Sequence, residues 1–347
     1  MTGNPWAVGA ATGVGSMPGQ DPVEAARVVI GELPELPYLP ELPNRGLGAD
    51  IIGRTAALLV DLAIEEVSSG YRVTARPGRD HQRAVGLLRT DLDALDEAIA
   101  SAGAAPAVLK VQAAGPWTLA AGIELRTGHR VLTDRGALRE FAASLAEGLA
   151  KHVAEIGGRT GATVVVQLDE PTLPAALAGR LSTPSGFGTV AAVEPADAET
   201  VLRGVLEAVP APRIVHCCAA NPPVRLLRAA GADAVALDVS LVSDASMADQ
   251  LGEFWDGGGT LLLGLVPPTD PGRQVTLRGL AEPALRLVDR LGFGRELLAT
   301  RALPTPGCGM AGASPGWARR ALTLCSELGR AFVDPPAEWR RSLTVDQ

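Results

Sequence analysis

The sequence predicts a (βα)8 TIM barrel, an α/β fold that forms a single domain over residues 1–347. Short apolar, β-branched runs alternate with longer segments of helical period, and this alternation continues to the end of the chain. Such alternation is typical of α/β proteins with parallel strands. The eight runs of this kind are the number that closes a barrel. An open, doubly wound sheet is the alternative fold.

The expected strands are short and are separated by helical segments. In chain order they are Ala11–Ser16, Tyr38–Leu42, Ala107–Ala113, Thr163–Leu168, Arg213–Cys218, Ala234–Val239, Thr260–Leu265 and Leu298–Leu303. Residues 50–99, with two helical patterns around Tyr71-Arg72-Val73, are expected to add an extra segment before the third strand. Because no repeat, charge block or Ser/Gly linker interrupts the chain, we assign one domain.

Helices are predicted where apolar residues recur at three- and four-residue spacing. Two such sets are Leu138, Phe141, Leu145, Leu149 and Val153, and Val201, Leu202, Val205 and Leu206. After the fifth expected strand, Asn221 is expected to be a helix N-cap, with Pro222 and Pro223 in the first turn and Gly231 just past the end.

The composition indicates a folded protein that acts on a small molecule. Hydrophobic residues make up 47% of the chain and charged residues 20%, which allows a large core. A net charge of −8 disfavours nucleic acid and anionic membranes as partners. The segment from Met1 to Met17 has no basic region, and no run of about 18 apolar residues occurs, so we expect a cytoplasmic protein.

His216, Cys218 and Cys308 form the motif that says most about function. Residues two apart on a strand point to the same face, so His216 and Cys218 can converge, and Cys308 lies in a Gly-Cys-Gly loop after the last expected strand. One imidazole and two thiolates suit tetrahedral Zn²⁺. Asp238, at the end of the next strand, is either a fourth ligand or a hydrogen-bond partner of a ligand. The alternatives are inert buried thiols and a Cys217–Cys218 disulfide.

The barrel prediction gathers polar residues at one face. The residues at the carboxyl ends of expected strands are Ser16, Asp169, Glu170, His216, Cys218 and Asp238. In barrels this is the active face. Because side chains alternate along a strand, we expect Asp169 to point into the mouth, where it can accept hydrogen bonds from a substrate ammonium, and Glu170 to point away. The alternative role for this pair is a carboxylate at a helix N-terminus.

The segment Gly13–Gly19 has the look of a dinucleotide fingerprint, but Pro18 stands where the third glycine belongs. We therefore reject that interpretation and expect Gly15 and Ser16 to approach a ligand carboxylate closely. The proline-rich segment Glu32–Pro43 is expected to pack at the barrel entrance, rather than to serve as a polyproline ligand. Glu41 and Arg45 are within reach of the mouth.

Together these motifs resemble the catalytic C-terminal domain of cobalamin-independent methionine synthase. The motifs that carry the resemblance, in the family's order, are Val14-Gly15-Ser16, Gln167-Leu168-Asp169-Glu170-Pro171, His216-Cys217-Cys218, Asp238 and Gly307-Cys308-Gly309. The resemblance implies a zinc-dependent barrel that transfers a methyl group to homocysteine sulfur. By position it implies zinc ligation by His216, Cys218 and Cys308, with Asp238 where the family has Glu, and amino acid binding by Val14, Gly15, Ser16 and the catalytic residue Asp169.

The chain departs from the family in three places. It is too short for the second, N-terminal barrel of the full-length enzyme; the histidine that follows the seventh strand is missing from Gly264–Asp270; and neither a folate surface nor the acidic homocysteine contact is recognisable. We therefore expect zinc-bound thiolate chemistry on homocysteine or a similar thiol. The methyl donor is left open: a folate, methylcobalamin or a methyl-carrying protein. The alternatives are alkylation of another thiol, and a non-catalytic or partner-dependent zinc-binding barrel.

Overall fold

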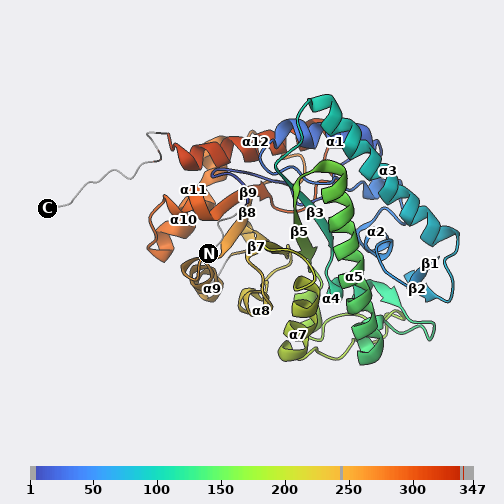
Figure 1. Ribbon diagram of the computed structural model, residues 1–347. Coiled ribbons are helices and arrows are strands. Elements are labelled where there is room, and N and C mark those ends of the chain that lie inside the picture. Colours follow the sequence, from blue (N-terminus) through green and yellow to red (C-terminus); the bar gives the residue numbers. More distant parts are fainter. Residues whose placement is uncertain (1–4, 243–244, 337–338, 340–347) are drawn as a thin grey trace.

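A curled parallel sheet of six strands lies at the centre of the computed structural model, which describes residues 5–242, 245–336 and 339. Helices surround this sheet (Figure 1). The strands, in spatial order, are β3 Val108–Ala114, β5 Thr163–Asp169, β6 Arg213–His216, β7 Ala234–Asp238, β8 Thr260–Val266 and β9 Ala302–Pro306. The mixed α/β class and the parallel, half-barrel sheet confirm the coarse prediction of the fold.

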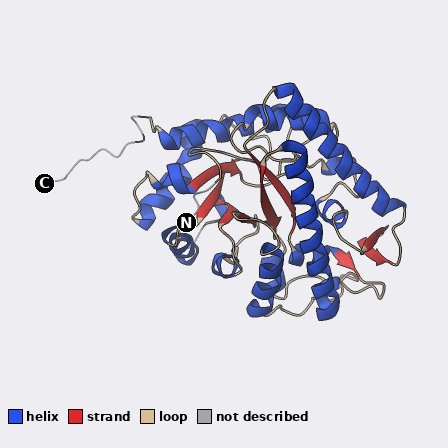
Figure 2. Cartoon of the chain, viewed as in Figure 1, coloured by secondary structure: helices blue, strands red, loops and turns tan. Residues whose placement is uncertain are grey.

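The helices cover the outer face of the sheet (Figure 2). The longer ones are α1 Pro22–Glu32, α3 Arg79–Ala102, α5 Arg135–Thr160, α7 Pro195–Leu206, α9 Ala245–Asp256, α10 Leu277–Leu291 and α12 Pro315–Val333; the shorter ones are α2 Ile51–Ala56, α4 Pro116–Gly122, α6 Leu173–Leu177, α8 Val224–Ala229 and α11 Leu297–Arg301. Local chemistry sets their ends. Asp134 accepts hydrogen bonds from the first turn of α5, and Gly161, with φ of 72°, ends that helix.

The inner face of the sheet changes from apolar to polar along the strands. A cluster that draws on all six strands fills the amino-terminal half of the interior, with Val108, Val165 and Ile214 among its members. The positions two and four residues further along these strands have the same orientation. They are Lys110, Gln112, Gln167, Asp169 and His216, all of them buried. The carboxyl ends of the strands therefore enclose a layer of polar side chains.

The first two expected strands are present only as extended segments with isolated bridges. Thr12 N donates to Pro304 O, Ser16 pairs with Glu41, and Tyr38 pairs with Lys110 on β3. In a parallel ladder the carbonyl of Thr12 would next accept from residue 306. That residue is Pro306, which has no N–H, so the ladder between the first segment and β9 stops after one bond.

Three local predictions were wrong. Leu298–Leu303 is not one strand, because Leu297–Arg301 forms α11 and β9 begins at Ala302. Asn221 does not cap a helix, because it has φ of 56°. Pro222 and Pro223 do not lie in the first turn either, because α8 starts after Pro223. A residue that precedes proline is disfavoured in the helical region, which delays the start of this helix. Gly231 does follow its end, with φ of 101°.

The extra segment before the third expected strand contains a hairpin that the helical patterns did not predict. Strands β1 Ala63–Val67 and β2 Gly70–Thr74 pair antiparallel, and β4 Ile123–Glu124 joins β2 in parallel. Tyr71 lies in β2, with α2 before the hairpin and α3 after it. Among the described helices, none combines the length and the hydropathy that crossing a membrane requires.

Candidate metal centre

Three side chains from distant parts of the chain meet at the carboxyl end of the sheet. His216 is the last residue of β6, Cys218 follows two residues later, and Cys308 lies in the loop after β9. Their candidate ligand atoms all lie within 4.8 Å of one another. A tetrahedral zinc site with bonds of roughly 2.0 to 2.3 Å separates its ligand atoms by about 3.3 to 3.8 Å. Small side-chain adjustments are therefore enough for the three to share one ion.

A carboxylate orients the imidazole of His216. The Nδ1 atom of His216 lies 2.9 Å from Asp169 Oδ1, which also accepts from Gln167 Nε2 at 2.7 Å. Opposite a carboxylate, Nδ1 carries the proton, so Nε2 keeps its lone pair. His216 is buried, and Nε2 has no hydrogen-bond partner among the described residues. A buried nitrogen without a partner beside two sulfur atoms is the donor set that a metal ion would complete.

The two candidate thiol ligands interact with each other. A hydrogen bond from the Cys218 thiol to Cys308 lowers the pKa of Cys308, and the same bond together with burial raises the pKa of Cys218. One thiolate therefore forms readily in this pair. Cys217 is different, because it is buried and burial raises its pKa to about 12. It lies outside the cluster, and it is not bonded to Cys218.

Asp238 does not join the three side chains. Its Oδ1 accepts a hydrogen bond from the backbone N–H of Ser240 at 2.8 Å, and it lies outside the cluster of three ligand atoms. Its Oδ2 would lie 3.0 Å from a Cβ atom placed on Gly307, so the carboxylate touches the loop that carries Cys308. Whether Asp238 ligates a metal stays a prediction.

The end of the first extended segment lies against the Cys308 loop. Met310 N donates to Ser16 O at 2.9 Å, and a Cβ atom on Gly309 would overlap Ser16 Oγ. Among the described residues, no acceptor lies opposite the amide N–H of Gly15 or of Ser16. These two adjacent donors face no protein partner and lie beside the cluster, as a site for a substrate carboxylate requires.

Glu41, which we expected only to lie within reach of the mouth, is buried beside Ser16. It pairs with Ser16 through the backbone, it is buried, and its Oε1 atom has no hydrogen-bond partner, with Arg54 Nε 3.8 Å away. Burial raises the pKa of Glu41 to about 7, and the charge of Asp169 also raises it. The signal in the sequence was a carboxylate inside an apolar, proline-rich run, which is costly unless it has a use.

Glu170 has a structural role. Its carboxylate accepts from the N–H groups of Trp117 and Thr118 and from Thr118 Oγ1, so it caps the amino terminus of α4. The two neighbouring carboxylates thus point in opposite directions: Asp169 faces the cluster, and Glu170 takes the helix-terminal role.

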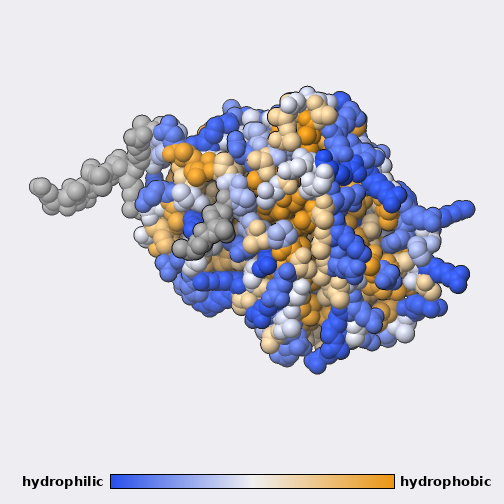
Figure 3. Space-filling view, in the orientation of Figure 1, coloured by the Kyte–Doolittle hydropathy of each residue, from blue (hydrophilic) through white to orange (hydrophobic). Residues whose placement is uncertain are grey.

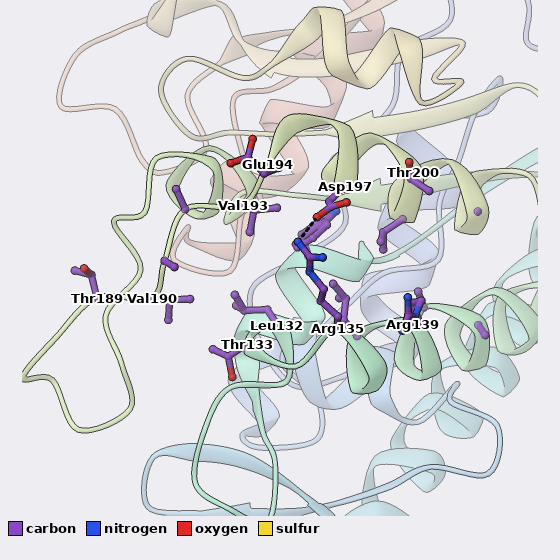
Figure 4. Close-up of a pocket in the computed structure, with 18 of the residues that line it drawn as sticks. Leu132, Thr133, Arg135, Arg139, Thr189, Val190, Val193, Glu194, Asp197 and Thr200 are labelled. Atoms are coloured by element: carbon purple, nitrogen blue, oxygen red, sulfur yellow. Dashed lines mark hydrogen bonds and ion pairs between the residues drawn. The ribbon is translucent and has the colours of Figure 1, made fainter.

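A separate hollow lies between α5 and α7 and has a volume of about 820 Å³. Figure 4 shows Arg135 and Asp197 paired across it, and Figure 3 shows hydrophobic residues between the hydrophilic outer surfaces of the two helices. None of the predicted site residues lines it. Its size makes it a candidate small-molecule pocket, but it lacks the nucleophilic and metal-binding groups of the cluster.

Comparisons with known proteins agree with the resemblance found in the sequence. A B12-independent methionine synthase from Shewanella sp. W3-18-1, solved with selenomethionine, superposes with a TM-score of 0.58 at 13% identity. A protein from Listeria monocytogenes, described as a vitamin-B12-independent methionine synthase, superposes with a TM-score of 0.55 at 14% identity. Each alignment covers 94% of this chain and 98% of the other. At these identities the likeness shows the fold.

A direct comparison with curated protein sequences finds no match. The family model for the catalytic domain of cobalamin-independent synthase, however, matches residues 9–330. The match includes every residue of the cluster and of the Gly15–Ser16 segment. The chain therefore belongs to the cobalamin-independent methionine synthase family, a family of methyltransferases in methionine biosynthesis, through its catalytic domain.

Proposed function

We propose that this protein is a zinc-dependent thiol S-methyltransferase that acts on homocysteine or a similar thiol. The observation that carries the proposal is the imidazole of His216: its buried Nε2 atom has no partner among the described residues, and its candidate ligand atom and two cysteine sulfurs all lie within 4.8 Å of one another. Zinc fits this set because imidazole and thiolate are its usual ligands. Bound there, zinc would supply a Lewis acid that favours the thiolate form of an incoming thiol.

The protein's own residues would hold the two ends of an amino acid. The free N–H groups of Gly15 and Ser16 are donors for a carboxylate, and Val14 precedes them in the same segment. Asp169 Oδ2 has no hydrogen bond to a described residue, and Glu41 Oε1 has none either, so both can accept from an ammonium group. A thiol amino acid held at both ends would present its sulfur to the cluster, and such alignment lowers the entropic cost of transfer.

The fold that supports this chemistry is, we infer, a closed (βα)8 barrel formed as one domain. The two extended segments that contain Ser16 and Tyr38 lie between β9 and β3, and backbone hydrogen bonds join them to both strands and to each other. In this view they are the first and second barrel strands, with ladders shortened by proline. The cytoplasmic location stays a prediction.

The methyl donor is not identified by these residues. Alkylation of another thiol and dependence on a methyl-carrying partner protein are the competing hypotheses. Activity measurements on the zinc-loaded protein can separate these two hypotheses from the proposed function. Methylfolates, methylcobalamin and a methylated carrier protein are each offered with homocysteine or another small thiol, and the methylated product is measured.

The decisive experiment measures zinc content and thiol binding in matched cysteine variants. Cys218→Ala and Cys308→Ala should each lose most of the one zinc expected per chain. Cys325→Ala, a buried cysteine in α12 outside the cluster, should keep it. Zinc-edge spectroscopy should show an added sulfur when homocysteine is supplied. Equal zinc content in all three variants, or an active metal-free protein, would refute the proposal.

A further inference from the structure

We propose that Lys110 is a positioning residue: from inside the sheet its ammonium group, together with Gln167, holds the carbonyl of Val14 and so sets the direction of the Gly15 amide. The role deepens the proposed function, because that amide is one of its carboxylate donors. The contacts themselves do not depend on zinc or on methyl transfer.

Lys110 is buried completely, which is unusual for lysine. It lies on β3 with 0% exposure, and it is one of two lysines among 31 basic residues. Its Nζ donates to Val14 O and to Gln112 Oε1, each at 3.1 Å, and lies 5.2 Å from the ring centre of Tyr38. A buried ammonium is costly unless such partners satisfy it. The partners here include the carbonyl oxygen of Val14, which directly precedes the proposed carboxylate donors.

The carbonyl of Val14 needs these side-chain donors. In a parallel ladder with β9, its donor would lie two residues past Pro306, where β9 has ended. Lys110 Nζ and Gln167 Nε2, at 3.1 Å and 2.8 Å, take the place of that backbone donor. Two inward-facing side chains from β3 and β5 thus hold the first extended segment at the position where it lacks a backbone hydrogen bond to β9.

Holding this carbonyl also sets the next amide. The peptide bond is planar and trans, so the carbonyl of Val14 and the N–H of Gly15 point in opposite directions. With the carbonyl fixed towards Lys110, the Gly15 N–H points away from the Lys110 ammonium, and no acceptor among the described residues meets it. A movement of Lys110 would therefore rotate a donor that the substrate carboxylate requires.

The backbone at Gly13 and Gly15 packs directly against the side chains that surround Lys110. A Cβ atom on Gly13 would overlap the ring of Tyr38, and one on Gly15 would lie 2.9 Å from Gln112 Cγ. Tyr38 and Gln112 are the same side chains that surround the ammonium group. Burial lowers the pKa of Lys110 to about 8, while the charges of Asp169 and Glu41 raise it.

The test compares the same substitution at the two lysines. Lys110→Met removes the donors at similar volume, and Lys151→Met makes that change on the exposed face of α5, where Lys151 pairs with Glu147. Lys110→Gln keeps a neutral donor, and it replaces Lys110→Met in the same measurements if the methionine variant does not fold. Hydrogen exchange is measured for the peptide that contains Gly13–Met17 and for a peptide from α12. Binding is measured for homocysteine and for 3-aminopropanethiol, which has the same thiol and amine but no carboxylate.

In Lys110→Met we expect about tenfold faster exchange in the Gly13–Met17 peptide, with no change in α12 or in Lys151→Met. We expect the Kd for homocysteine to rise about tenfold and the Kd for 3-aminopropanethiol to change by less than about twofold. Equal weakening of both thiols, or unchanged exchange in the Gly13–Met17 peptide, would overturn the proposal. If the wild-type protein binds neither thiol, the proposed function fails, and the exchange result alone decides the role of Lys110.

Discussion

The imidazole of His216 and the carboxylate of Asp169 are joined by a 2.9 Å contact between Nδ1 and Oδ1. This contact leaves Nε2 as the histidine's free nitrogen. It also gives Asp169 two functions in the proposed mechanism, because one oxygen orients the histidine while the other is available to a substrate ammonium. The residue predicted to bind substrate therefore also orients a side chain of the candidate metal centre.

Replacing Asp169 by Asn should weaken zinc binding about tenfold or more, because the amide no longer fixes the proton on Nδ1. Competition with a chromophoric chelator measures the change. Glu170→Gln is the control, since Glu170 faces α4 rather than the histidine. It should leave zinc affinity within about twofold of the wild type while it lowers the free energy of unfolding. Equal zinc affinity in the Asn variant and the wild type would contradict the orienting role.

Replacing Asp238 by Asn should cost less zinc affinity than replacing Cys308 by Ala. Asp238 lies outside the cluster, and its Oδ1 is engaged by Ser240 N. We expect the Asn variant to retain one zinc per chain after dialysis, with Cys308→Ala as the reference for loss of a ligand. If the two variants lose zinc to the same extent, Asp238 is a ligand, as its place in the family pattern implies.

Replacing Gly309 by Ala should disturb substrate binding. A Cβ atom at this position would overlap Ser16 Oγ, so either Ser16 or the Cys308 loop has to shift. We expect the Kd for homocysteine to rise about tenfold or more. Gly316→Ala is the matched control, because nothing lies within 4 Å of the added atom there. Comparable binding in the two variants would show that the loop moves freely.

Replacing Glu41 by Gln should change how stability depends on pH. The folded pKa of about 7 lies above the ordinary value of 4.5, so the folded state holds the proton more tightly. That contribution to stability is complete below pH 4.5 and is lost as pH rises through 7. Because Gln cannot ionise, the variant should gain on the order of 1 to 3 kcal/mol relative to wild type between pH 5 and pH 8.

Urea unfolding at the two pH values measures this difference in free energy. Glu170 also has a pKa raised to about 7, but it is present in both proteins and cancels in the comparison. A constant difference between variant and wild type across this range would show that Glu41 is already ionised in the folded protein at pH 5.

Much of the fold followed from periodicity, and the misses have identifiable causes. The central strands from β3 to β8 were predicted to within two residues at either end, because buried parallel strands read as short apolar runs. The start of β9 was missed because the apolar residues of α11 run directly into it. The first extended segment was expected as a full strand, since nothing within it reveals that its partner offers prolines at 304 and 306.

The candidate site shows a similar division. Spacing and strand ends predicted that His216, Cys218 and Cys308 converge, and their candidate ligand atoms do lie within 4.8 Å of one another. Their role as zinc ligands stays a prediction. The Asp169–His216 contact depends on the register of β5 against β6, which pairs these two residues. A single sequence does not reveal that register. Lys110 was missed because a lysine inside an apolar run carries no local sign of what it will touch.

The prolines of β9 leave the first extended segment joined to that strand by one backbone hydrogen bond among the described residues, and this junction runs beside the proposed substrate site. A bound amino acid that contacts Gly15 and Ser16 on one side and the Cys308 loop on the other would add contacts across this junction. Binding there should raise the thermal midpoint as ligand concentration rises, because a ligand that binds only the folded protein stabilises it by mass action.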